Sequence, residues 1–343
     1  MSHEADAVWR EGARILTICN ACRYCEGFCA VFPAMEKRVE FPRAELNYLA
    51  NLCHNCGECF YACQYAPPHE FAVNVPRTLA QIRVSSYEEY AWPFWGRRFS
   101  SGLAWGIAAF AIIASFWAPS AVDFYGVIPH GVMVGVFEAI AAFVLVALVV
   151  GGARFSVGGR DESRPGTLKR ALRAILRLEY LSSGGAGCTY PDEHHSEARR
   201  WFHHLTFYGF FLCFASTTVA AIDHYFFSWF APYPYTSLPV LLGTLGGVGL
   251  LLGPAGLGWL KQRQDRDIAN PAQGGMDFEF IALLFLTSLT GLLLLLLRES
   301  PFMANLLLVH LGFVMALFIA LPCPLVSPSV RLFVCPSIDS FRR

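Results

Sequence analysis

The chain has 343 residues, of which 55% are hydrophobic and only 15% are charged. About a quarter of the residues of a typical soluble protein are charged, so this composition excludes an ordinary soluble protein. The formal net charge is +0, so the total charge gives no indication of a nucleic-acid partner.

Two runs of four cysteines with the same spacing lie in the first 63 residues, which are otherwise rich in polar side chains. Each run reads C-x2-C-x2-C-x3-C, and Pro33 and Pro67 follow the last cysteine of each run at the same offset. The eight cysteines are Cys19, Cys22, Cys25 and Cys29 in the first run and Cys53, Cys56, Cys59 and Cys63 in the second. We interpret the two runs as an internal repeat that binds metal.

This spacing is typical of proteins with two [4Fe–4S] clusters. The first three thiolates of such a run bind one cluster, and the fourth binds the other cluster. We therefore expect Cys63 to join the first three cysteines of the first run, and Cys29 to join those of the second. Zinc and disulfides are the alternatives, but a C-x2-C-x2-C row that occurs twice favours clusters.

Residues 1–98 are expected to form a helical, ferredoxin-like head. The first eleven residues are polar and lack the apolar core of a secretory signal, so we expect no signal peptide. After the second run, Pro67 and Pro68 exclude a helix interior, so residues 64–71 are expected to form a loop that covers a cluster. Because eight cysteines already fill eight ligand positions, His69 is expected to order this loop rather than to bind metal.

Six apolar segments follow the head, each near the ~20 residues that cross a bilayer. They lie at about 102–118, 132–152, 205–231, 238–260, 279–297 and 302–321. We therefore predict a mainly α fold in which a six-helix transmembrane domain, residues 99–322, follows the head and precedes a tail, residues 323–343. Basic residues gather in the connections 153–201 and 261–278, whereas the opposite loops contain no Lys or Arg except Arg298. The positive-inside rule then places the N-terminal head and both basic connections in the cytoplasm.

The fourth apolar segment contains several glycines. No strand pattern precedes them and no suitable acidic residue follows, so a dinucleotide-binding loop is excluded by context. Gly249 and Gly253 form a G-x-x-x-G pattern instead, which predicts close packing against another helix.

Four histidines in or beside the apolar segments are candidate cofactor ligands, because polar groups inside a bilayer are costly. His224 and His310 are expected at similar depth, roughly 10–13 Å below the outer surface at ~1.5 Å per residue. Such a pair can hold a haem b, or can form a plain hydrogen-bonded contact. His203 and His204 can bind a second haem, bind quinone or cap the helix near the lipid headgroups. His130, in an outer loop, is given no role.

The segments 18–29, 52–56, 63–71, 202–209 and 309–312 resemble the tricarballylate/citrate utilisation protein B family over nearly the whole chain. The resemblance implies a multi-pass protein of the bacterial inner membrane that reoxidises a flavin-dependent dehydrogenase. Electrons would pass through two [4Fe–4S] clusters and haem b to the quinone pool. The membrane part is also similar to the gamma subunit of nitrate reductase. The chain would then be a redox subunit rather than a complete enzyme.

Two other functions stay open at this point. One is a membrane-tethered iron–sulfur redox sensor or assembly module, and the other is an electron supplier to a monooxygenase of corrin synthesis, where a related fused protein acts. The tail also departs from the family pattern, because Pro322 begins a proline-rich stretch where family members continue with a basic segment and another histidine. This departure leaves His203 and His204 without an expected inner partner.

Overall fold

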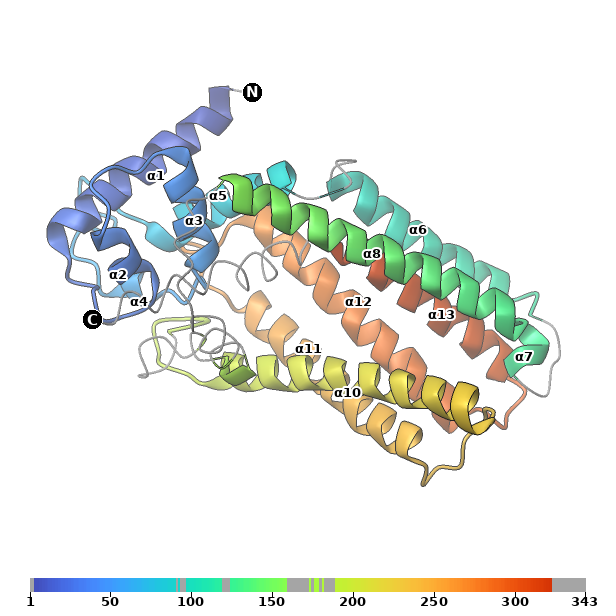
Figure 1. Ribbon diagram of the computed structural model, residues 1–343. Coiled ribbons are helices and arrows are strands. Elements are labelled where there is room, and N and C mark those ends of the chain that lie inside the picture. The colour runs from blue at the N-terminus through green and yellow to red at the C-terminus, as the bar shows by residue number, and fades with distance from the viewer. Residues whose placement is uncertain are drawn as a thin grey trace.

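The computed structural model describes residues 3–90, 92, 97–118, 124–158, 173, 176–178, 181 and 189–322. Within these residues the protein is helical and has no strand, which confirms the predicted mainly α fold. Figure 1 shows five N-terminal helices, α1–α5, at one end of a set of long helices. Most of the predicted basic connection 153–201 and all of the tail 323–343 lie outside the described residues.

The head consists of α1 (His3–Cys22), α2 (Val31–Glu36), α3 (Arg43–Leu52), α4 (Glu58–Tyr61) and α5 (Val75–Tyr90). Apolar side chains recur at helical spacing on α3, where Leu46, Leu49 and Ala50 are buried. They pack with Leu16 of α1 and Ile82 of α5 in one core. Both cysteine runs lie at the ends of these helices, so the head core fixes their positions.

The long helices are α6 (Arg97–Ser115), α8 (His130–Gly158), α10 (Ala198–Phe227), α11 (Leu238–Gln262), α12 (Pro271–Leu296) and α13 (Met303–Ala320), with the short α7 (Phe124–Val127) before α8. Each predicted apolar segment therefore contains a helix. Five of these helices are long and apolar enough to cross a membrane, while the apolar part of α6, Ser100–Ser115, is shorter.

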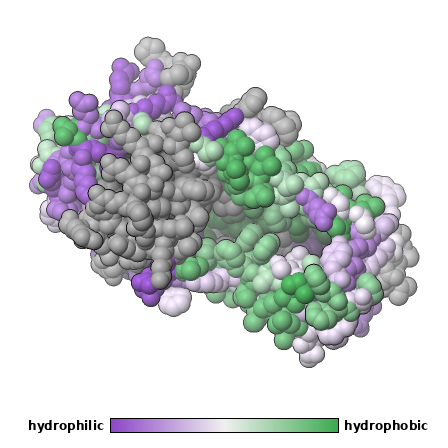
Figure 2. Space-filling view, in the orientation of Figure 1, coloured by the Kyte–Doolittle hydropathy of each residue, from purple (hydrophilic) through white to green (hydrophobic). Residues whose placement is uncertain are grey.

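Most apolar side chains of these helices point outward rather than into a core. In α10, for example, only 6% of the most apolar window is buried. Figure 2 shows hydrophilic side chains gathered over the head and hydrophobic ones over the long helices. Exposed apolar side chains of this kind are stable in contact with lipid rather than water. Helices can cross lipid because they satisfy their own backbone hydrogen bonds.

Helices α10 and α11 approach each other through glycines. A Cβ atom added at Gly249 would lie 2.9 Å from the carbonyl oxygen of Leu205, and one added at Gly209 would lie 2.9 Å from the carbonyl oxygen of Gly246. A Cβ atom at Gly253 would lie 2.7 Å from the backbone nitrogen of Thr206. The predicted packing role of Gly249 and Gly253 is confirmed.

The end of α10 differs from the prediction. The helix ends at Phe227 rather than near residue 231, because Ser228 adopts the left-handed conformation (φ 55°), which stops the helix. His224 is therefore about 5 Å from the end of its helix, whereas His310 lies about 10 Å inside α13. The predicted end of this helix near residue 231 was wrong, and the expectation that His224 and His310 lie at similar depth relied on it.

We expect Gly253→Ala to destabilise the protein by about 1–3 kcal/mol, because the new methyl group meets the backbone of α10 and forces the two helices apart. Gly258→Ala on the same helix is the matched control, since its Cβ atom would lie 3.6 Å from Ile281 in ordinary contact. Thermal unfolding in detergent, followed by circular dichroism at 222 nm, measures both variants. Equal melting temperatures for the two variants would contradict the account of α10–α11 packing.

Candidate metal centre

The eight N-terminal cysteines form two groups in which the two sequence runs are mixed. Cys63 of the second run raises the pKa of Cys19 and of Cys25, so it lies beside these two thiols of the first run. Conversely, Cys29 of the first run is affected by Cys56 and Cys53. We name the set Cys19, Cys22, Cys25 and Cys63 the first thiol group, and the set Cys29, Cys53, Cys56 and Cys59 the second thiol group.

The first thiol group lines a cavity of about 260 Å³. Cys59 of the second thiol group also lines it, and apolar side chains, Gln64 and the rings of Tyr24 and Tyr65 complete its wall. Burial, and after it the neighbouring Cys63 thiol, raises the pKa of Cys19 and of Cys25 to about 12. These two thiols are therefore protonated at neutral pH unless a positive charge enters the cavity and stabilises their thiolates.

The second thiol group is more deeply buried. Burial raises the pKa of Cys29 and of Cys59 well above the usual value, while backbone N–H groups of Val31 and Phe32 hydrogen-bond Cys29 and partly offset this effect. The backbone nitrogen of Asn55 donates to the Cys53 sulfur at 3.4 Å.

The donor set fits a multinuclear metal group. Each group gathers four thiols that are buried or half-buried, and thiolates prefer iron–sulfur clusters, zinc and copper(I). Within the described residues, no set of three or more His, Cys, Asp or Glu side chains is placed to hold one metal ion. Nor does a disulfide join any of the nine described cysteines. A group of several metal atoms that reaches four separate thiolates is compatible with this spacing.

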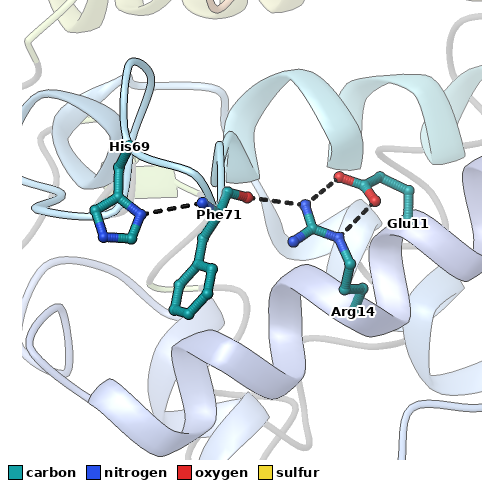
Figure 3. A network of polar contacts seen from close by, with 4 residues as sticks. All are labelled: Glu11, Arg14, His69 and Phe71. Carbon is teal, nitrogen blue, oxygen red and sulfur yellow. Dashed lines mark hydrogen bonds and ion pairs between the residues drawn. The ribbon is translucent and has the colours of Figure 1, made fainter.

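A loop, residues 64–73, covers the first thiol group. Figure 3 shows how it is held: the Arg14 guanidinium donates to the carbonyl oxygen of Phe71 at 3.0 Å and pairs with Glu11. His69 Nδ1 accepts a hydrogen bond from the backbone nitrogen of Phe71 at 3.0 Å, and the His69 ring contacts those of Tyr65 and Phe71. The expectation that His69 orders this loop is confirmed.

The second thiol group lies at the ends of α10 and α11. Cys56 and Phe202 of α10 both pack against a small cluster formed by Tyr190 and by Leu260 of α11, and the carbonyl oxygen of Cys56 accepts a hydrogen bond from Thr189 at 3.1 Å. Two further hydrogen bonds join the head to the connection after α11. Tyr61 donates to Asp265 at 2.9 Å, and Asn74 donates to the carbonyl oxygen of Asp267 at 2.7 Å. No local pattern predicts these contacts, because they join residues far apart in the chain.

His224 has a partner that sequence analysis missed. Its ring stacks on that of His130, the first residue of α8, with centroids 4.2 Å apart and planes at 14°. His310 instead contacts α12, where its Nδ1 lies 3.2 Å from the Thr290 hydroxyl and its ring lies against Gly291. None of the contacts described for these residues joins His310 to His224, so their pairing on a haem stays a prediction. His130 begins α8, and His224 lies near the end of α10. The prediction that both residues lie at the outer end of the bundle was the one signal in the sequence for this contact.

His203 and His204 lie at the other end of α10, near the second thiol group. His204 Nδ1 lies 3.0 Å from the carbonyl oxygen of Arg200, and its ring is stacked on Tyr208, with centroids 6.0 Å apart. The hydroxyl of Tyr208 donates to the carbonyl oxygen of Leu176 at 2.7 Å. These contacts orient the His204 ring at the end of the bundle that faces the head.

Comparison with known proteins covers both parts of the chain. The family described as citrate utilization protein B matches residues 105–333, and the one described as citrate utilization protein B Fer4-like domain matches residues 12–89. A protein of Escherichia coli called citrate utilization protein B is 47% identical over 331 residues, covering 91% of this chain and 86% of the relative. No solved structure matches the chain.

Proposed function

The chain belongs to the citrate utilization protein B family, and on this premise we propose that it is the membrane electron-transfer subunit of a citrate- or tricarballylate-utilisation system. The observation that carries the proposal is the pair of four-thiol groups in a head that abuts membrane-type helices. A Fer4-like head on such helices supports an iron–sulfur protein that transfers electrons at a membrane.

We assign the first thiol group to one [4Fe–4S] cluster and the second to another. When bound, these clusters supply one-electron carriers. The protein's own residues surround the thiols, cover the first group with the loop held by Arg14, and pack Cys56 of the second group against the cluster of Tyr190 and Leu260. Burial keeps water away from the thiolates.

A flavin-dependent dehydrogenase is the proposed electron donor, and the quinone pool the proposed acceptor. Between them we propose a haem b in the bundle, for which His224, His310, His204 and His203 are candidate ligands. The contact with Thr290 engages Nδ1 of His310, which leaves Nε2 as the nitrogen that can bind iron. Figure 2 shows a hollow between the long helices, over α8 and α10, that is lined with hydrophobic residues. This hollow suits an apolar macrocycle or quinone.

Iron content and ligation test the cluster assignment. Protein purified without oxygen is expected to carry about eight iron atoms per chain, in two [4Fe–4S] clusters. Cys29→Ala should damage the cluster that is bound mainly by the second run, whereas Cys25→Ala should damage the other. Electron paramagnetic resonance of the reduced protein distinguishes the two. Stoichiometric zinc with almost no iron would overturn the assignment.

Reporter fusions test the proposed orientation. The head and both basic connections are expected in the cytoplasm, because Lys and Arg are retained on that side. A fusion at Arg170 should then be active as a cytoplasmic reporter, and one at Asp123 as a periplasmic reporter. A cytoplasmic Asp123 would reject both the orientation and the access of a cytoplasmic donor to the head.

Spectra of dithionite-reduced membranes test for haem. We expect a b-type spectrum that His310→Ala abolishes, because the variant lacks an imidazole that would bind the haem iron. His130→Ala is the control, since it removes the imidazole stacked on His224 without removing a proposed ligand. A haem that survives in His310→Ala but is lost in His204→Ala would move the site to the other end of α10.

A further inference from the structure

Arg83 of α5 is a buried cation beside the second thiol group. Its side chain is only 3% exposed, and its NH1 atom donates to the carbonyl oxygen of Cys53 at 2.7 Å. The other guanidinium nitrogens, Nε and NH2, are buried and have no hydrogen-bond partner among the described residues. A buried guanidinium is stable when its charge and its N–H groups are satisfied, so this arrangement needs an acceptor.

No described carboxylate supplies that acceptor. The ion pair that joins Arg43 to Glu89 of α5 is exposed, and no ion pair in the described residues includes Arg83. A [4Fe–4S] cluster on four thiolates carries net negative charge, and its sulfur atoms accept hydrogen bonds. The second thiol group, which contains Cys53, is therefore the place where the missing acceptor would be bound.

The charges around the two thiol groups differ. A second cation approaches the second group, since Arg199 donates to the carbonyl oxygen of Asn55 at 3.4 Å and lies over the Tyr190 ring. Near the first group, Arg14 is paired with Glu11, and Glu58 raises the pKa of Cys25. Arg23 is exposed there, so solvent screens its charge. Buried positive charge is thus concentrated on the second group.

We propose that Arg83 sets the reduction potential of the cluster in the second thiol group above that of the cluster in the first. The inference rests on the proposed function, because it concerns the clusters assigned there. Reduction adds one electron, and thus one negative charge, which a buried cation and its hydrogen bonds stabilise. When the first cluster gives up one electron and the second takes it, the electron moves to lower free energy.

The direction of this transfer agrees with the position of the second group. Cys56 packs against a cluster that contains Leu260 of α11, Thr189 hydrogen-bonds its carbonyl oxygen, and Asp265, in the connection after α11, accepts a hydrogen bond from Tyr61 of α4. The group with the higher potential is thus the one in contact with the membrane helices. Arg83 is a positioning residue in this account, because it acts on the cluster through charge and hydrogen bonds.

An anaerobic redox titration of the full chain in nanodiscs, monitored by electron paramagnetic resonance, tests the proposal. In Arg83→Gln, the reduction potential of one cluster should fall. The fall should correspond to an equilibrium constant for reduction of that cluster that is about tenfold smaller. The affected signal should be the one that Cys29→Ala removes. Arg83→Lys should restore most of the potential, because it keeps the charge. Arg77→Gln is the matched control, since it removes the same charge from an exposed position of the same helix and should leave both potentials unchanged.

Two clusters with unchanged potentials in Arg83→Gln would overturn the inference and show that the buried N–H groups bind water instead. If Arg83→Gln fails to retain iron, Arg199→Gln is measured instead. It should lower the potential of the same cluster to a smaller extent, and an unchanged potential in Arg199→Gln would reject the inference. Wild-type protein without iron would refute the proposed function itself, so the two failures are distinguishable.

Discussion

The gathering of eight thiols into two groups, largely out of water, is the constraint on which the rest of the structure depends. Burial strongly disfavours thiolates, as the raised pKa values of Cys19 and Cys29 indicate. A metal group can bind only if its own positive charge offsets this cost and if the protein brings four thiols together. Each thiol group contains cysteines from both runs, so neither group can form unless the two runs come together. The helices between the runs, α2 and α3, therefore have to pack in one core. Folding of the head and assembly of the metal groups are therefore coupled.

The junction between head and membrane helices follows from the position of the second thiol group. Cys56 of this group packs against Tyr190 and against Leu260 of α11, in the same cluster as Phe202 of α10, and Phe202 also lies against Gly256 of α11, where no side chain is present. The glycines that bring α10 and α11 together therefore also shape the surface that receives Cys56. Packing inside the bundle and contact with the head depend on the same pair of helices.

Local patterns in the sequence were enough to predict much of this arrangement. The cysteine spacing predicted the mixed groups, the apolar segments predicted the long helices, and Gly249 with Gly253 predicted tight helix packing. Contacts between distant segments could not be predicted, because they depend on the tertiary fold. His224 stacks on His130 because two helices end at the same level, and Arg83 reaches Cys53 because α5 packs beside the second run. The early end of α10 depends on the backbone at Ser228, which hydropathy does not report.

The most direct test of the central claim is an experimental structure, by electron cryo-microscopy, of the protein purified without oxygen. The account predicts two cubic clusters, with Cys63 completing the ligands of the first and Cys29 those of the second, and with the second cluster next to Phe202 and Arg83. A structure in which each run of four binds its own cluster, or in which single zinc ions occupy the thiol groups, would contradict it.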